Sequence, residues 1–176
     1  VVPVICAPQA AAAVTTIFDG LGRVVPWNDF CLLGASCGDE HSREHFVETA
    51  VMNAARRTRL VQAVGQSDPH VGYALLRLCC GFTLGVYYMR AHGPSPHYAT
   101  LDSATSTAFD SFVVPLDNSS TAIAELSIRF GGFGMRPCRP YAGLAFTTSV
   151  RSCMKYTHTL IRNHDASPLS LDQDWQ

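Results

Sequence analysis

The sequence predicts a mainly α-helical protein: an orthogonal or irregular helical bundle around a central apolar helix, with a small irregular or short-strand N-terminal part. Three observations support this fold class. Apolar residues recur every three or four positions along most of the chain after residue 38. Glycine and proline separate these segments, and the connections are short. With 47% apolar and 15% charged residues, 176 residues are enough for one buried core.

Three regions are expected along the chain. Residues 1–38 form an irregular N-terminal segment, in which 1–6 and 30–35 are extended and 10–17 makes one or two helical turns. Residues 39–161 form the helical bundle. The polar residues 162–176 are expected to be a frayed tail.

The central helix is expected over residues 68–91 (DPHVGYALLRLCCGFTLGVYYMRA). Asp68 is a suitable cap, and Pro69 fits the first turn, where no backbone donor is needed. Residues 71–89 are apolar on nearly every side. A helix of this kind must be surrounded by other elements, so we expect it at the centre of the bundle.

Two features of this helix bear on its surroundings. Gly81 and Gly85 lie one turn apart and would let a neighbouring helix approach closely. Arg77 lies on the same row and needs a partner or a route to water. The stretch nearly has the length of a membrane span, but Arg77 would then cost about 2.5–3.5 kcal/mol. We therefore expect a core helix and no membrane partner.

The first helix of the bundle is expected to begin at Asp39 or Ser42, to run to about Val64, and to be capped by Gly65. Its apolar stripe recurs at helical spacing and consists of Phe46, Val47, Ala50, Val51, Ala54, Thr58 and Val61. Three further helices are bounded by caps and prolines: from Ser95–Pro96 to Pro115, from Asn118 or Ser119 to Leu126, and from Pro137 or Pro140 to about Ile161.

Between the last two helices lies the sequence RFGGFGMR, residues 129–136. Gly131, Gly132 and Gly134 cannot sustain a helix and permit positive φ and close backbone packing, so a structural loop is predicted. The flanking apolar residues are expected to tuck this loop against the core: Phe130, Phe133 and Met135. A phosphate loop is disfavoured because no strand precedes the glycines and no Lys-Ser or Lys-Thr follows them.

The seven cysteines are odd in number and irregularly spaced, and Cys79 and Cys80 are adjacent in the apolar helix. Reduced, buried thiols in an intracellular protein are therefore expected, with cytoplasm and nucleus not distinguished. A signal peptide has a basic n-region followed by an apolar core and a cleavage site, and we find no such pattern in this sequence.

Two patterns suggest a metal site. His41 and His45 match H-x-x-E-H with Glu44 as the base, but the third ligand is missing unless Glu48 or Glu125 supplies it. With Cys31 and Cys37 the same histidines read C-x5-C-x3-H-x3-H, a spacing too short for a ββα zinc finger. The sequence also lacks a G-x-S-x-G elbow and adjacent aspartates. No catalytic residue, metal or cofactor is predicted.

Three stretches together resemble the region downstream of the polymerase core in reverse-transcriptase-like proteins of non-LTR retroelements. They are LLGASCG (residues 32–38), DPHV through LLRLCCGF (68–82) and LSIRFGGFGMR (126–136). The family pattern runs roughly L-L-G-x-P-x-G, D-P-Q-x-A-x-x-L-L-R-x-C and L-P-x-x-x-G-G-L-G-L-R, followed by a helix rich in alanine and serine. That helix is echoed here by Ala142, Ala145, Phe146 and Ser149. Ser36 and Ser127 stand where the pattern usually has proline.

The resemblance covers about residues 30–150 and implies the thumb and the helices after it. The palm, whose paired aspartates hold two metal ions for nucleotidyl transfer, would lie before Val1, so the resemblance implies a non-catalytic part of an RNA-directed DNA polymerase. Such a part packs beside template and primer. It would contact an RNA–DNA hybrid or duplex, and the polymerase core would be a second partner.

Candidate contacts to the sugar-phosphate backbone are Arg56, Arg57, Arg59, Arg129 and Arg136, because basic side chains bind backbone without reading sequence. The net charge of -1 gives no global basic signal for nucleic acid. A different class of function therefore stays open: a small helical protein-interaction or structural module without a nucleic-acid role.

Overall fold

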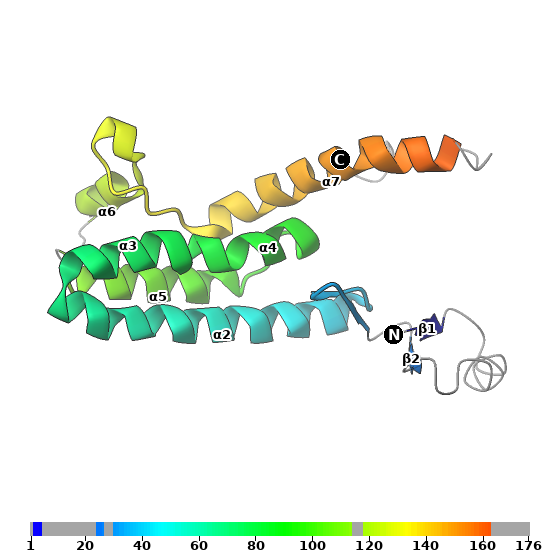
Figure 1. Ribbon diagram of the computed structural model, residues 1–176, viewed down its shortest axis with the longest axis horizontal. Helices are drawn as coiled ribbons and strands as arrows, with labels where there is room; N and C mark the ends of the chain where they lie inside the picture. The colour runs from blue at the N-terminus through cyan, green and yellow to red at the C-terminus, as the bar shows by residue number, and fades with distance from the viewer. Residues whose placement is uncertain (1, 5–23, 27–29, 114–117, 163–176) are drawn as a thin grey trace.

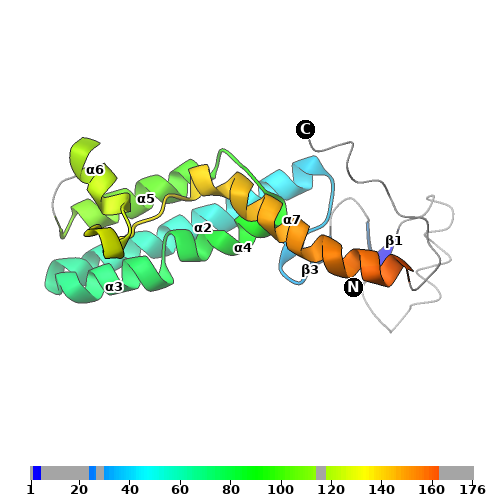
Figure 2. The same cartoon turned by 90° about the horizontal axis from the view of Figure 1, so that it is seen from above.

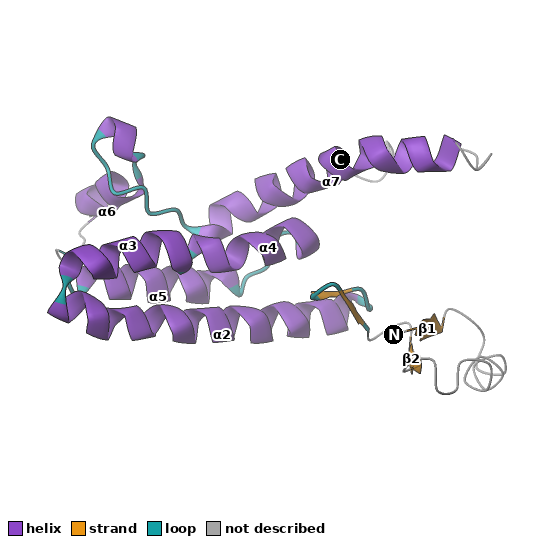
Figure 3. Cartoon of the chain, viewed as in Figure 1, coloured by secondary structure: helices purple, strands orange, loops and turns teal. Residues whose placement is uncertain are grey.

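The computed structural model describes residues 2–4, 24–26, 30–113 and 118–162. The described part is mainly helical with short strands near the N-terminus, so the predicted fold class is confirmed (Figure 1; Figure 3). The helical turns predicted at 10–17 and most of the predicted tail, 163–176, lie outside the described residues.

The helices follow one another with short connections. They are α2 (Glu40–Ser67), α3 (Pro69–Cys79), α4 (Phe82–His92), α5 (Tyr98–Asp110), α6 (Asn118–Glu125), the 3-10 turn η1 (Ile128–Phe130) and α7 (Cys138–Arg162). Helices α3 and α4 follow each other end to end in one row, and this row lies beside α2 and α5 along the long axis of the molecule (Figure 1; Figure 2).

Helix α2 is the longest element, and it begins as predicted. Asp39 is its N-cap, and the Asp39 carboxylate accepts a hydrogen bond from the Ser42 N–H at 2.8 Å. The predicted end was wrong: Gly65 lies inside the helix, which continues to Ser67. Gly65 is buried because α3 crosses there, so its missing side chain serves packing between helices.

The predicted central helix is two helices. Asp68 caps α3 as expected, accepting from the N–H groups of His70 and Val71 at 3.0 and 3.1 Å. The helix breaks at Cys80 and Gly81, and α4 then starts at Phe82.

Gly81 explains the break. Its φ of 52° with ψ of -122° lies outside the helical region, a conformation that glycine adopts at little cost. Its N–H donates to Thr58 Oγ1 of α2 at 3.3 Å instead of to a helical carbonyl. A Cβ on Gly81 would come 2.9 Å from Thr105 Oγ1, and one on Gly85 2.8 Å from Cys138 Sγ. The expected close approach at these glycines is therefore confirmed, with α5 and the start of α7 as neighbours.

The sequence predicted that this apolar stretch would be surrounded by other elements. The structure shows instead that the α3–α4 pair has an exposed apolar side. Leu78 is 61% exposed, and Val71 and Tyr87 are also exposed. The core lies instead between α5 and its neighbours, in two clusters. One is Val47, Val51, Ala54, Ala55, Met89, Tyr98, Leu101, Ala104, Cys138 and Ala142. The other is Val61, Leu76, Cys80, Ala108, Phe109, Ala124 and Met135.

Helix α7 is anchored to α5 at its first turn. Both carboxylate oxygens of Asp102 accept backbone hydrogen bonds, from Cys138 N–H at 2.5 Å and Arg139 N–H at 2.9 Å. The first half of α7 packs on α4, and the second half extends beyond the bundle (Figure 1; Figure 2). Its exposed apolar side chains include Leu144 and Tyr156.

The N-terminal strands are short. β1 (Val2–Val4) pairs in parallel with β2 (Val24–Pro26), and β3 (Cys31–Leu32) pairs antiparallel with β4 (Ala35–Ser36). The extended run predicted over 30–35 is therefore a hairpin, turning at Leu33 and Gly34. Both turn residues have positive φ, 52° and 81°. The turn is held to α4 because Tyr87 Oη donates to the Leu33 carbonyl at 2.5 Å.

Replacing Leu33 with asparagine should stabilise the protein by about 1 kcal/mol, because a left-handed backbone is unfavourable for leucine and ordinary for asparagine. The Leu33 side chain is 91% exposed, so little apolar burial is lost. Urea unfolding measures the change. The matched variant Leu32→Asn, beside it on β3, should give no gain, and equal gains from both would contradict the turn geometry.

Candidate functional site

The glycine loop, residues 126–137, folds back along α6. Residues Ile128–Phe130 form the turn η1, and Gly131 follows in the left-handed region with φ of 85°. The N–H groups of Gly134 and Met135 donate to the carbonyls of Leu126 and Ala124 at 2.8 and 2.9 Å. A Cβ on Gly132 would overlap the carbonyl oxygen of Leu126, so this glycine permits the close return of the loop.

Aromatic contacts hold the loop to the core. Tyr73 Oη of α3 donates to the Phe133 carbonyl at 2.5 Å, and the Phe133 ring lies 5.1 Å from the Phe109 ring. Met135 is buried. The predicted packing of the loop against the core is confirmed for Met135. It holds in part for Phe133, which contacts Phe109 but is 36% exposed, and it is wrong for Phe130, which is 64% exposed. Phe130 lies on η1, which Gly131 terminates before the chain returns to the core.

A hollow of about 230 Å³ lies between this loop and the α3–α4 junction. Arg77, near the end of α3, and Arg136, on the loop, both line it, and both residues are exposed to solvent. Three hydroxyl-bearing residues and several apolar ones complete its wall: Thr83, Thr105, Ser127, Leu76, Leu78, Phe82, Ile128, Gly134 and Met135. The predicted site residues Arg136 and Gly134 are therefore brought together with Arg77.

Neither arginine of the hollow has a carboxylate partner within the described residues, where the ion pairs join only histidine to glutamate. The Arg136 guanidinium lies 6.0 Å from the Phe82 ring centroid. Two acidic side chains, Asp102 and Glu125, line a smaller hollow of about 40 Å³ that Arg136 also borders. Both carboxylate oxygens of Asp102 already accept hydrogen bonds from backbone N–H groups in the first turn of α7.

Two guanidinium groups beside one hollow have the chemistry to hold an anion. Of the hydroxyls, those of Thr83 and Thr105 already donate to the carbonyls of Arg77 and Leu101, at 3.3 and 2.8 Å. Arginine presents fixed, forked donors that match phosphate and carboxylate oxygens. Arg129 adds a third positive charge nearby, 5.0 Å from the Phe130 ring centroid on η1. The sequence indicated that Arg77 needs a partner or a route to water, and its exposed position gives it that route, but it was not predicted as a site residue. An arginine inside a long apolar stretch was the available signal.

The other predicted arginines do not converge. Arg56, Arg57 and Arg59 are all exposed on α2. At 3.6 residues per turn, Arg56 and Arg59 lie about 60° apart on one face, whereas Arg57 points about 160° away from Arg59. In Figure 1, α2 lies below α3, whereas α6 and the glycine loop lie above it. The three side chains therefore form no common site with Arg129 and Arg136.

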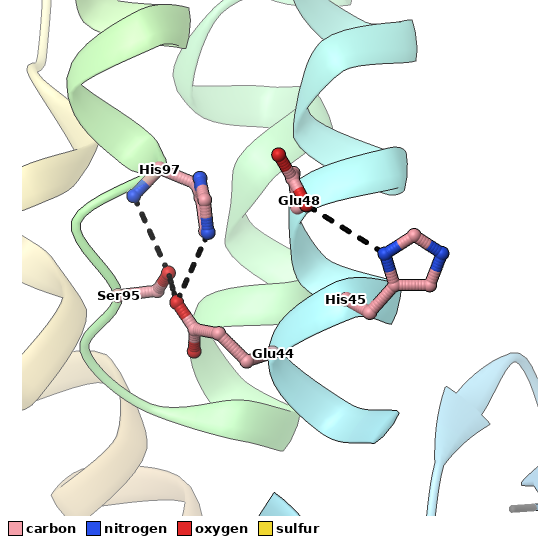
Figure 4. Close-up of polar contacts among 5 residues, drawn as sticks. All are labelled: Glu44, His45, Glu48, Ser95 and His97. Carbon is pink, nitrogen blue, oxygen red and sulfur yellow. Dashed lines mark hydrogen bonds and ion pairs between the residues drawn. The ribbon is translucent and has the colours of Figure 1, made fainter. Parts of the chain in front are cut away.

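The H-x-x-E-H pattern does not assemble a metal site. Glu44 turns toward the α4–α5 connection, where Glu44 Oε1 accepts from Ser95 Oγ at 2.9 Å and lies 3.2 Å from His97 Nε2 (Figure 4). His45 pairs separately with Glu48 at 3.6 Å. Among the described residues no group of three or more potential ligands lies together. Ser95 and His97 bind the same carboxylate, whereas a catalytic triad places histidine between serine and acid.

The cysteines differ from the expected buried set. All six in the described part of the chain are free. Cys80 and Cys138 are buried, whereas the other four are exposed: Cys31, Cys37, Cys79 and Cys153. Burial raises the pKa of both buried thiols, so neither supplies a thiolate nucleophile near neutral pH.

His92, at the end of α4, is held neutral by its surroundings. Both ring nitrogens are shielded from solvent and find no hydrogen-bond partner among the described groups, and the ring lies 5.5 Å from that of Phe46. Burial first, and the charge of Arg43 second, lower the pKa of His92 below its usual value.

Stability should therefore fall as the pH drops below about 6.5, where the unfolded histidine takes up a proton that folded His92 does not. The variant His92→Phe should lose much of this decline, measured as the melting temperature between about pH 7.5 and 5.5. The variant of an exposed histidine, His70→Gln, should keep it. An unchanged decline in His92→Phe would show that other groups cause it.

One described stretch, Pro69–His92, is long and apolar enough to cross a membrane by length and composition alone, with 28% of its most apolar window buried. It is interrupted at Gly81, and it carries Arg77 within it.

Comparison with protein-family models, with curated proteins and with solved structures finds no match to this chain.

Proposed function

We propose that this chain is a non-catalytic, thumb-like helical region that holds the sugar-phosphate backbone of a nucleic acid at the arginine-lined hollow. The observation that carries the proposal is the pair Arg77 and Arg136, which border one hollow without a carboxylate partner among the described residues. A phosphate supplies the charge that two such guanidinium groups lack. An RNA–DNA hybrid or duplex is the expected ligand class.

The resemblance to the region after the polymerase core supports the same proposal. Two of its three stretches, residues 68–82 and 126–136, provide both walls of the hollow. The polymerase core would then be a second partner. The remaining stretch, residues 32–38, forms the β3–β4 hairpin against α4, where Tyr87 binds its turn.

The test is fluorescence anisotropy of the full chain with an RNA–DNA hybrid that carries a single-stranded template overhang. Affinity should fall by about tenfold or more between about 50 and 200 mM salt, as two or three phosphate contacts require. Absence of binding at low salt, or binding that salt leaves unchanged, would contradict the proposal.

A second candidate is a protein-interaction or structural module. The exposed apolar side chains of α3, α4 and α7 favour it, among them Leu78, Tyr87, Leu144 and Tyr156. This candidate predicts a concentration-dependent oligomer in sedimentation velocity without any affinity for nucleic acid.

A further inference from the structure

Phe130 is an exposed aromatic side chain two residues along the chain from Ile128, which lines the arginine-lined hollow. It is 64% exposed, and the Arg129 guanidinium lies 5.0 Å from its ring centroid. Ile128, two residues earlier in the same turn η1, lines the hollow. In a 3-10 turn of about three residues, Phe130 points about 120° away from Ile128, so its ring projects from the same turn beside the hollow and not into it.

A second pairing of a cation with an aromatic ring lies across the hollow. Phe82 is part of the wall, and the Arg136 guanidinium lies 6.0 Å from its ring. Phe82 also meets Tyr141 of α7 edge to face at 5.9 Å, and Tyr141 is exposed. Arginines and aromatic rings are thus interleaved along this face.

A surface that combines arginines with aromatic rings is expected to bind some forms of nucleic acid better than others. A duplex presents phosphates but keeps the faces of its bases stacked inside, except at its two ends, so it offers an exposed ring little surface to stack on. An unpaired strand presents both phosphates and base faces, and its binding sites combine positive charge with aromatic side chains. The net charge of -1 leaves little long-range attraction, so short-range stacking gains importance.

We infer that this face takes the unpaired strand of a nucleic acid, with one phosphate between Arg77 and Arg136 and a neighbouring base stacked on Phe130. The inference rests on the proposed function and adds the form of nucleic acid that the site prefers. Overhangs beside a hybrid and free single strands share this chemistry.

The experiment compares three labelled probes at low salt: a blunt RNA–DNA hybrid, the same hybrid with a template overhang, and a thymidine oligonucleotide. Wild-type protein should bind the last two more tightly. The variant Phe130→Ala should weaken their binding by about 5- to 150-fold, as expected for the loss of one stacked base, and leave the blunt hybrid unchanged. Phe130→Trp should retain the preference.

Leu144→Ala is the matched control, since it removes an exposed apolar side chain from α7, outside the wall of the hollow. It should change none of the three affinities, and circular dichroism establishes that each variant is folded.

Equal affinity for the blunt and overhanging hybrids, with Phe130→Ala without effect, would overturn this inference while the proposed function stood. A salt-independent result or no binding to any probe would remove both. Loss of self-association in Phe130→Ala, with nucleic-acid affinities unchanged, would assign the exposed ring to a protein contact and also overturn the inference.

Discussion

Replacing Gly72 with alanine is expected to lower the free energy of unfolding by about 2 kcal/mol, because the new methyl group has no space. Its Cβ would overlap the Cα of Gly65 and lie 3.0 Å from the Gly65 nitrogen, where α3 crosses α2. Backbone atoms cannot rotate away as a flexible side chain can. The two helices must separate, and the Phe112 ring, 3.4 Å from the same position, must move with them.

Gly143→Ala is the matched control. Gly143 also lies inside a helix, α7, but a Cβ there would meet only Pro94 Cγ at 3.8 Å, an ordinary contact. Alanine is a better helix former than glycine, so this variant should gain about 0.5–1 kcal/mol. Both variants replace one glycine with alanine, and their free energies of unfolding in urea should differ by about 3 kcal/mol. Equal stabilities would show that α2 and α3 do not cross closely.

Removing both charges of the hollow is expected to have the largest effect on binding. The double variant Arg77→Gln with Arg136→Gln should weaken affinity for the overhanging hybrid by about tenfold or more, since each arginine loses charge-assisted hydrogen bonds to phosphate. The slope of log affinity against log salt should also become shallower by about one to two. Anisotropy titrations at several salt concentrations measure both quantities.

The control for the hollow variant removes two positive charges from a different surface, that of α2. The double variant Arg56→Gln with Arg57→Gln also takes away two positive charges, but from α2, where the side chains diverge. It should retain most of the affinity. If this variant loses as much as the hollow variant, the interface lies on α2, or only net charge matters. Arg90→Gln, at the exposed end of α4, provides a single-charge control for Arg77.

The helices could be predicted because each carries its own local signals. Asp39 and Asp68 cap α2 and α3 as expected, and the prolines place the starts of α5 and α7 to within about two residues. Such signals act within one turn of the chain, so they can be recognised without knowledge of the tertiary fold. The predicted end of α5 at Pro115 was wrong, because the helix ends at Asp110.

The predictions of helix ends and burial were wrong where contacts between residues far apart in the chain determine the structure. Gly81 ends a helix because Thr58, 23 residues earlier, offers its N–H another acceptor, and no local pattern shows that. Gly65 resembled a C-cap, whereas it lies where α3 crosses α2. An apolar stretch was taken as a surrounded helix, although Leu78 is exposed.

The candidate site was predicted only in part for the same reason. Arg136 and the glycines of the loop drew attention by their local pattern. Arg77 joins them only because α3 and the loop come together, 59 positions apart in the chain. The α2 arginines cluster in sequence, but Arg57 points about 100° away from Arg56 and about 160° away from Arg59 on the helix.

The most direct test of the account is nuclear magnetic resonance of the isotope-labelled full chain during titration with the overhanging hybrid. Changes in amide chemical shift should concentrate at residues 77–83 and 127–136, the two walls of the hollow, and leave the arginine segment of α2 nearly unchanged. Shifts confined to α2, or no shifts at a hybrid concentration that saturates anisotropy, would contradict a phosphate site between Arg77 and Arg136.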